Sequence, residues 1–132
     1  MLNKVMLIGN VGKDPEVRST RTGEPVATFS MATSRKWKDP KTGQRQEQTE
    51  WHTIVCWSQI AKVVGDYVKR GKLVYVEGRL QTRSWDDKGE KRYRTEIICE
   101  KLLMLGTSSG KPESSDAEGT GAPGDEGEDL PY

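Results

Sequence analysis

Four tryptophans are the residues whose type and setting most clearly suggest chemistry in this chain of 132 residues. Trp37 stands between Lys36 and Lys38, and Trp85 follows Arg83 at a spacing of two. An indole ring can stack on an unpaired nucleobase, at about 1–3 kcal/mol per base, while a neighbouring cation contacts the phosphate. This combination favours binding of single-stranded nucleic acid over ordinary packing. The four tryptophans are Trp37, Trp51, Trp57 and Trp85.

Candidates for catalysis or metal binding are few. His52 is the only histidine, and no recognisable catalytic motif places a serine, cysteine or carboxylate beside it. Cys56 and Cys99 lie in separate apolar runs, which predicts two reduced thiols in the core and no metal site. Asp86 and Asp87 begin a turn, where such residues normally serve backbone geometry. We therefore expect a protein that is not an enzyme and that uses neither a cofactor nor a metal ion.

The charge is divided between two segments of opposite sign. Residues 1–110 hold 20 Lys and Arg against 13 Asp and Glu, a net charge of +7, whereas residues 111–132 hold 1 against 7, a net charge of −6. The acidic segment is rich in glycine and proline and nearly lacks apolar residues, so it is predicted to be disordered. We expect a basic domain over residues 1–106, a flexible linker over 107–124 and an acidic tip over 125–132.

The acidic tip has the features of a short recognition peptide. Its last three residues include two apolar side chains, directly behind a cluster of carboxylates. We expect these residues to bind partner proteins: Asp125, Glu126, Glu128, Asp129, Leu130, Pro131 and Tyr132.

Neither a membrane span nor a secretion signal is apparent in the sequence. No apolar run reaches the 18 residues that a spanning helix needs, and the first residues carry no cleavage-type signal. A cytoplasmic protein is therefore expected, and binding to nucleic acid would associate it with the nucleoid.

Five runs rich in Val, Ile and Tyr predict five β-strands, at residues 5–8, 26–33, 51–57, 73–85 and 93–99. Between the third and fourth runs, apolar residues at helical spacing predict one amphipathic helix, with Ser58 as its N-cap and its end at residues 69–71. The apolar residues of this helix are Ile60, Val63, Val64, Tyr67 and Val68.

This order of elements predicts a mainly β fold, a five-stranded oligonucleotide/oligosaccharide-binding (OB) barrel with one α-helix between strands three and four. Secondary structure alone also allows other small α+β folds. Residues 37–49 and 86–92 are polar and turn-forming and carry several basic residues, which suits hairpins that extend from a barrel.

Strand alternation predicts which side chains face outward. In the third strand, Ile54 and Cys56 suit the core, so Trp51 and Trp57, of the other parity, should face outward. In the fourth strand, one face is basic and aromatic and carries Tyr75, Arg79, Gln81, Arg83 and Trp85, provided that no bulge intervenes.

Three stretches resemble those of the bacterial single-stranded DNA-binding protein family, in the same order: NKVMLIGNVGKDPEVR, TEWHTIVCW and LVYVEGRLQTRSW. The resemblance covers residues 1–106 and implies an OB barrel that assembles as a homotetramer. Trp57 stands where relatives more often have phenylalanine, and the chain ends in Leu-Pro-Tyr where relatives end in Ile-Pro-Phe.

The resemblance implies that His52 and Tyr75 lie in stretches that contribute to subunit contacts. It also implies that the tip binds enzymes of replication, recombination and repair. The residues expected to contact single-stranded DNA are Trp37, Trp51, Trp57, Trp85, Arg35, Lys36, Lys38, Arg79, Arg83, Lys91 and Arg92.

The leading hypothesis is therefore sequence-independent binding and protection of single-stranded DNA, with the tip recruiting partner enzymes. The main alternative is a primosomal or RNA-binding module on the same fold, and a nuclease built on that fold is a more distant one. The acidic tip favours the leading hypothesis, because a primosomal relative is expected to lack it.

Overall fold

The structure, a computed structural model, describes residues 1–106, so the predicted linker and tip lie outside the described residues. Strands dominate this part of the chain, and a single helix lies between the fourth and fifth of them. The strands are β1 (Val5–Val11), β2 (Glu16–Ser19), β3 (Pro25–Lys38), β4 (Arg45–Trp57), β5 (Leu73–Asp87) and β6 (Glu90–Met104), and the helix is α1 (Ser58–Tyr67).

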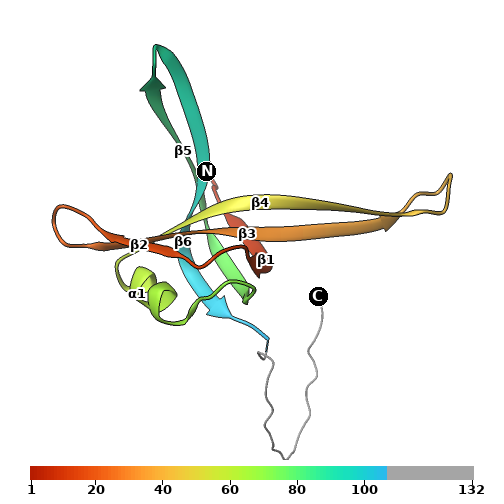
Figure 1. Ribbon diagram of the computed structural model, residues 1–132, viewed down its shortest axis with the longest axis horizontal. Helices are drawn as coiled ribbons and strands as arrows, with labels where there is room; N and C mark the ends of the chain where they lie inside the picture. The colour runs from red at the N-terminus through yellow and green to blue at the C-terminus, as the bar shows by residue number, and fades with distance from the viewer. Residues whose placement is uncertain (107–132) are drawn as a thin grey trace, which may run out of the picture.

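Five of the strands close into a barrel (Figure 1). The sheet order is β1-β5-β6-β4-β3-β2, and an additional pairing of β1 with β3 closes the ring. All pairings are antiparallel except that of β4 with β6, where Ile54 lies opposite Ile97. The predicted OB barrel is confirmed, and β2 is an extra strand on the outer edge of β3.

The core follows from the alternation predicted for the strands. On β4, Ile54 and Cys56 are fully buried, as are Val74 and Val76 on β5. Strand parity on β5 continues past Gly78, because the register irregularity between Glu77 and Gly78 places the extra residue on β6. The core cluster consists of Val11, Ala27, Phe29, Met31, Ile54, Cys56, Ala61, Val64, Val68, Val74, Val76, Ile97 and Cys99.

Both cysteines are buried and free, as predicted. Cys56 and Cys99 lie on the parallel pair β4 and β6, one step beyond the Val55–Ile98 register. The neighbouring Cys99 thiol, together with burial, raises the pKa of Cys56, which keeps this thiol protonated at neutral pH.

Two long hairpins project from the barrel, as Figure 1 shows for β3–β4 and β5–β6. The predicted strand limits were too short. The β3–β4 ladder continues to the Lys38–Arg45 pair, and the β5–β6 ladder continues to Asp87–Glu90. Polar residues form these outer strands because both of their faces are exposed, so they lack the apolar alternation that marks a half-buried strand. We call the two projections the β3–β4 arm and the β5–β6 arm.

The helix packs its buried side chains Ala61 and Val64 against the barrel. The predicted Ser58 cap is wrong: Trp57 occupies the N-cap position and no side chain caps the helix there. Ser58 instead adopts a φ of 54° and donates its hydroxyl hydrogen to the carboxylate of Glu24. β4 ends at Trp57 and α1 begins at Ser58, so the extended residue before the helix is Trp57, and Ser58 already lies inside the first turn.

Candidate nucleic-acid interface

All four tryptophans are exposed, as strand parity predicted for Trp51, Trp57 and Trp85 and as the basic neighbours of Trp37 predicted for that residue. Their exposed fractions are 39% for Trp37, 60% for Trp51, 42% for Trp57 and 44% for Trp85. Exposed indole rings on a protein of this size are costly to leave in water, so they mark a surface that another molecule can cover.

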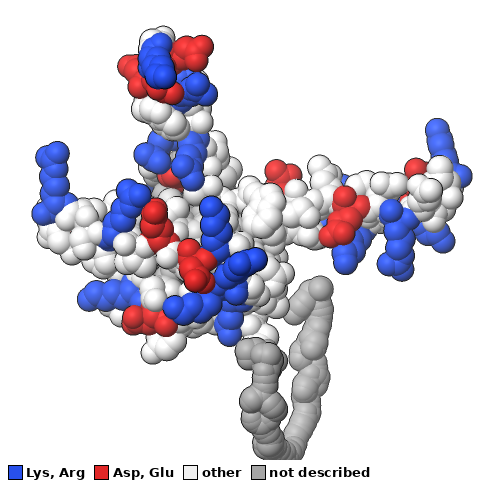
Figure 2. Space-filling view, viewed as in Figure 1, with Lys and Arg blue, Asp and Glu red and all other residues white. Residues whose placement is uncertain are grey.

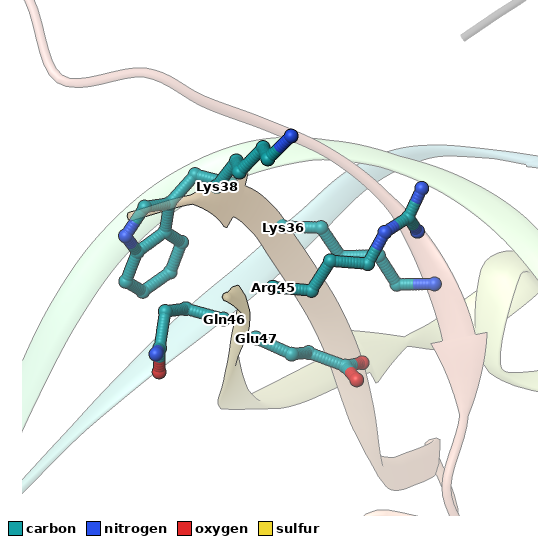
Figure 3. A pocket seen from close by; sticks show the side chains of 6 residues that line it. Lys36, Lys38, Arg45, Gln46 and Glu47 are labelled. Carbon is teal, nitrogen blue, oxygen red and sulfur yellow. The ribbon is translucent and has the colours of Figure 1, made fainter. Parts of the chain in front are cut away.

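The β3–β4 arm carries one hollow, which we call the arm pocket (Figure 3). Lys38 lies directly opposite Arg45 in the ladder, close to the turn. The guanidinium carbon of Arg35 lies 4.8 Å from the centre of the Trp37 ring, within range of a cation–π interaction. The arm pocket is lined by Lys36, Trp37, Lys38, Arg45, Gln46 and Glu47.

A second hollow, the barrel hollow, lies where the β5–β6 arm leaves the barrel. It brings Trp57 of β4 together with Arg79 and Arg83 of β5, as strand parity required for the basic face. An aromatic wall beside two cations offers a base a surface for stacking and its phosphate a partner. The barrel hollow is lined by Val26, Thr28, Val55, Trp57, Arg79, Gln81, Arg83, Glu96 and Ile98.

A third hollow continues from the second, since Thr28 lines both. Arg94 contributes to its wall and donates a hydrogen bond to the hydroxyl of Thr53 at 3.4 Å. We call it the Lys13 hollow; it is lined by Lys13, Asp14, Glu16, Thr28, Phe29, Ser30, Thr53 and Arg94.

The tryptophans do not share one face of the β3–β4 ribbon. Trp37 lies opposite Gln46 and Trp51 lies opposite Ala32, and side chains alternate along each strand. Trp37 therefore points to the face that continues into the core, and Trp51 points to the outer face. A strand of nucleic acid that touches both rings must cross an edge of the arm.

The predicted cations on the β5–β6 arm differ in their neighbours, which are an aromatic ring for Arg83 and carboxylates for Arg92. Arg83 lies 6.0 Å from the centre of the Trp85 ring. Arg92 makes ion pairs with Asp87 and Glu90, at 3.5 and 3.6 Å. Lys91 is adjacent to Arg92 in sequence and so points to the other face of the hairpin. Figure 2 shows cations and carboxylates on both arms, with cations prominent along the β3–β4 arm and the two kinds of charge close together at the tip of the β5–β6 arm.

The residues expected at subunit contacts lie away from these hollows. Tyr75 pairs with Ile8 of β1 and with Leu103 of β6. Its hydroxyl donates to Glu77 at 2.6 Å, and Lys4 donates to the same carboxylate at 2.6 Å. These hydrogen bonds, Lys4 first, lower the pKa of Glu77. His52 is half-buried, 2.9 Å from the Thr33 hydroxyl.

Several residues of the hollows were missed at the sequence level. Arg94 and Glu96 share the parity of Ile98 on β6, so alternation carried into the last strand could have found them. The place of Arg45 in the arm pocket depends on its pairing with Lys38 across the turn, and only the strand register reveals that pairing. Lys13 reaches its hollow through barrel closure, for which the sequence has no local signal.

The remaining predictions concern absences or residues outside the described part of the chain. Among residues 1–106, no three acidic, histidine or cysteine side chains are grouped so that they could hold a metal ion. No helix in that range is long and apolar enough to cross a membrane. The predicted partner-binding residues, 125–132, lie outside the described residues.

Residues 2–105 match the model of the "Single-strand binding protein family". The chain belongs to this family. This family member has a five-stranded barrel, one helix after the third barrel strand and four exposed tryptophans.

Two curated relatives are similar over most of this family member. It is 52% identical over 118 residues to "Single-stranded DNA-binding protein 1" of Chlorobaculum tepidum, covering 88% of this chain and 72% of the relative. It is 45% identical over 127 residues to "Single-stranded DNA-binding protein 1" of Xylella fastidiosa, covering 95% of this chain and 93% of the relative.

Two solved structures share the fold of this family member. One is a "Plasmodium falciparum SSB complex with ssDNA", with a TM-score of 0.74 and 40% identity, covering 80% of this chain and 96% of the other. The second is a deletion mutant of the single-stranded DNA binding protein from Thermus aquaticus, with a TM-score of 0.71 and 31% identity, covering 81% of this chain and 52% of the other.

Proposed function

We propose that this protein binds single-stranded DNA without sequence preference and protects it during replication, recombination and repair. Bases stack on the exposed tryptophans, and lysine and arginine contact the phosphates. The observation that carries the proposal is the barrel hollow, where Trp57 meets Arg79 and Arg83 on one surface. The relative solved with ssDNA, 40% identical to this chain, supports the same ligand.

The role is one of binding and not of catalysis. The hollows combine aromatic rings, cations and polar side chains that suit a backbone and stacked bases. The net charge of +7 over residues 1–106 adds a sequence-independent attraction to phosphate. This attraction weakens at higher salt, because the counterions released from the DNA on binding then gain less entropy.

Tryptophan fluorescence tests the proposal directly. The chain is titrated with an unlabelled poly-pyrimidine DNA strand, with the matching duplex and with RNA of the same sequence, at several salt concentrations. We expect strong, salt-sensitive quenching by single-stranded DNA, little by duplex and weaker binding to RNA. Equal or tighter binding to RNA would support the RNA-binding alternative, and no quenching by any of them would contradict the proposal.

We propose further that the protein assembles as a homotetramer through the outer face of β1, β5 and β6. Met6 and Ile8 on β1 are 63% and 43% exposed, and Leu103 on β6 is 47% exposed. Ile8, Tyr75 and Leu103 lie in one row across the three strands, so an exposed apolar stripe flanks a residue expected at a subunit contact.

Sedimentation equilibrium tests the assembly. The wild-type chain should have four times the monomer mass of 14.8 kDa, and Ile8→Lys should lower that mass. Lys62→Glu, an exposed change on α1, is the matched control and should leave the mass unchanged. A monomeric wild-type chain would contradict the assembly.

We also propose that the acidic tip, residues 125–132, recruits partner enzymes. Its carboxylates and its apolar end suit a basic-rimmed, apolar pocket on a partner protein. Purified replication and repair enzymes should bind the full chain more tightly than a chain that ends at residue 124. Equal binding by both chains would contradict this role.

A further inference from the structure

One charged side chain is buried among the described residues. Glu96 of β6 is 5% exposed and lines the barrel hollow beside Trp57. A carboxylate taken out of water is costly unless cations and hydrogen-bond donors compensate for the loss of hydration. A carboxylate is also unexpected in the wall of a groove for a polyanion, so its partners need an account.

Glu96 is held by two arginines. Arg83 donates from Nε to Oε1 at 3.0 Å and from Nη2 to Oε2 at 2.9 Å, which is a bidentate ion pair. The Nε atom of Arg94 lies 3.7 Å from Oε2 of the same carboxylate. Both cations therefore share one buried anion.

The register explains why such an anion is needed. Arg83 of β5 and Arg94 of β6 lie directly opposite each other in the ladder. Like charges in directly opposed positions destabilise an antiparallel pair. Glu96 lies two residues from Arg94 on the same face, where its carboxylate reaches both guanidinium groups and offsets their repulsion.

The bidentate pair leaves part of Arg83 free. A guanidinium has five N–H donors, of which Glu96 takes two, and the Arg83 side chain remains 54% exposed. The same pair holds the guanidinium carbon 6.0 Å from the Trp85 ring centre. The remaining donors thus face solvent from a fixed plane beside an indole ring.

Glu96 also joins two of the hollows. Its first partner, Arg83, lines the barrel hollow, and its second partner, Arg94, lines the Lys13 hollow. Arg94 is held from its other side by the Thr53 hydroxyl at 3.4 Å. One carboxylate therefore orients a cation in each of two adjoining parts of the surface.

We propose that Glu96 is a positioning residue for single-stranded DNA, which orients Arg83 and Arg94 toward successive phosphates without touching the DNA itself. The inference rests on the proposed function. Ordering long side chains before binding lowers the entropic cost of the complex, so the pre-formed arrangement increases affinity. Simple Coulomb repulsion between the carboxylate and the phosphates would instead lower the affinity. The direction in which a substitution of Glu96 changes the affinity for DNA therefore separates the two effects.

Glu96→Gln is the first test, with Glu100→Gln as the matched control. Glu100 lies on the same strand and pairs with Arg79 at 3.0 Å, but its side chain is 53% exposed and the pair is not bidentate. We expect E96Q to weaken binding of a poly-pyrimidine strand about tenfold, the effect of losing one charge-assisted hydrogen bond. The slope of log K against log salt concentration should become less negative by about 0.7, which is the change expected when one phosphate contact is lost. E100Q should bind as wild type or slightly tighter.

A double-mutant cycle shows whether Glu96 acts through Arg83. If it does, E96Q should weaken binding less in the R83Q chain than in wild type, and it should weaken binding no further once Arg94→Gln is added to R83Q, because Glu96 then has neither arginine to orient. Fully additive losses would overturn the proposal. Tighter binding by E96Q, with a steeper salt slope, would also overturn it, because the carboxylate would then only repel phosphate.

A measurement on the unaltered chain covers the case in which E96Q fails to fold. The Arg83 Nε–H resonance, assigned by its loss in R83Q, should exchange slowly with water and should stay slow when DNA is bound. Rapid exchange in the complex would mean that phosphate displaces Glu96, which overturns the proposal. Absence of DNA binding by the wild-type chain would overturn the proposed function together with this inference, whereas wild-type binding with E96Q at least as tight would overturn this inference alone.

Discussion

Gly12 lies directly beneath the indole ring of Trp51. A β-carbon at Gly12 would lie 2.5 Å from Cζ3 of Trp51 and 2.8 Å from the Ser30 hydroxyl oxygen. The Gly12 N–H donates to the Ser30 carbonyl oxygen at 2.9 Å, which ties this backbone to β3. The ring therefore rests on backbone, and the absence of a side chain at position 12 allows it to lie there while 60% exposed.

Gly12→Ala should displace the Trp51 ring. The added methyl group lies well inside contact distance of both neighbours, so the indole must rotate away from its place on the surface. We expect weaker binding of single-stranded DNA by about 1 kcal/mol, within the range for one stacked base, and less fluorescence quenching. Gly65→Ala, whose methyl group would meet only Val17 at 3.1 Å, is the control. Equal effects of the two substitutions would show that Gly12 has no special relation to binding.

Trp57→Ala should reduce affinity for single-stranded DNA more than the loss of Tyr67, an exposed aromatic residue of α1 outside the hollows. Trp57 forms the aromatic wall beside Arg79 and Arg83, so its loss removes a stacking surface of about 1–3 kcal/mol. Titration with a poly-pyrimidine strand, followed by DNA anisotropy, measures the loss without depending on tryptophan emission. Tyr67→Ala on α1, at a site 63% exposed, should bind as wild type. Unchanged affinity of W57A would show that the barrel hollow is not part of the DNA-binding surface.

Arg45→Gln should weaken binding equally for all base sequences. Arg45 lines the arm pocket opposite Lys38, and we expect a flexible cation at this position to contact phosphate and not a base edge. For a single strand, the slope of log K against log salt concentration should become less negative by about 0.7. Lys62→Gln, an exposed change on α1, should leave the slope unchanged. A loss that depends on base sequence would show that Arg45 reads bases.

The Glu77 network should make stability depend on acid pH. Hydrogen bonds from Lys4 and Tyr75 lower the pKa of Glu77 below its ordinary value of 4.5. As the pH falls, the unfolded chain therefore takes up a proton at Glu77 before the folded chain does. The contribution of ionised Glu77 to the free energy of unfolding is complete above pH 4.5 and is lost as the pH falls through the lower pKa of the folded state. Urea unfolding between pH 7 and pH 3 should show a shallower decline for Glu77→Gln than for wild type. Glu50→Gln, an exposed change on β4, should follow wild type; the same decline in E77Q and wild type would contradict the role of Glu77.

Strand parity predicted much of the fold because it reports burial locally. Ile54 and Cys56 entered the core and Trp51 and Trp57 faced outward, since a half-buried strand must alternate. The outer halves of the arms and β2 gave no such signal. All four residues of β2 are exposed, so its hydrogen bonds to β3, and not its side chains, make it a strand.

The Ser58 prediction failed for a related reason. A hydroxyl residue before an amphipathic run is a good N-cap only where the chain arrives extended and the side chain is free. Here Trp57 is the extended residue before the helix, and Ser58 itself has a φ of 54°. Glu24, distant in sequence, accepts the hydrogen bond from the Ser58 hydroxyl. That partner comes from the turn before β3, which no local pattern around Ser58 contains.

The sequence by itself determined the order of the five barrel strands and the helix, the outward tryptophans and the division of the chain into a basic and an acidic segment, because periodicity, residue type and charge are local properties. Tertiary structure decided which cation meets which ring and which carboxylate. Trp57 meets Arg79 only because β4 and β6 pair in parallel, and Glu96 reaches both Arg83 and Arg94 only in the register that the β5–β6 ladder adopts. Cross-strand register depends on the closure of the whole barrel, so the binding surface is a property of the closed sheet and not of any one strand.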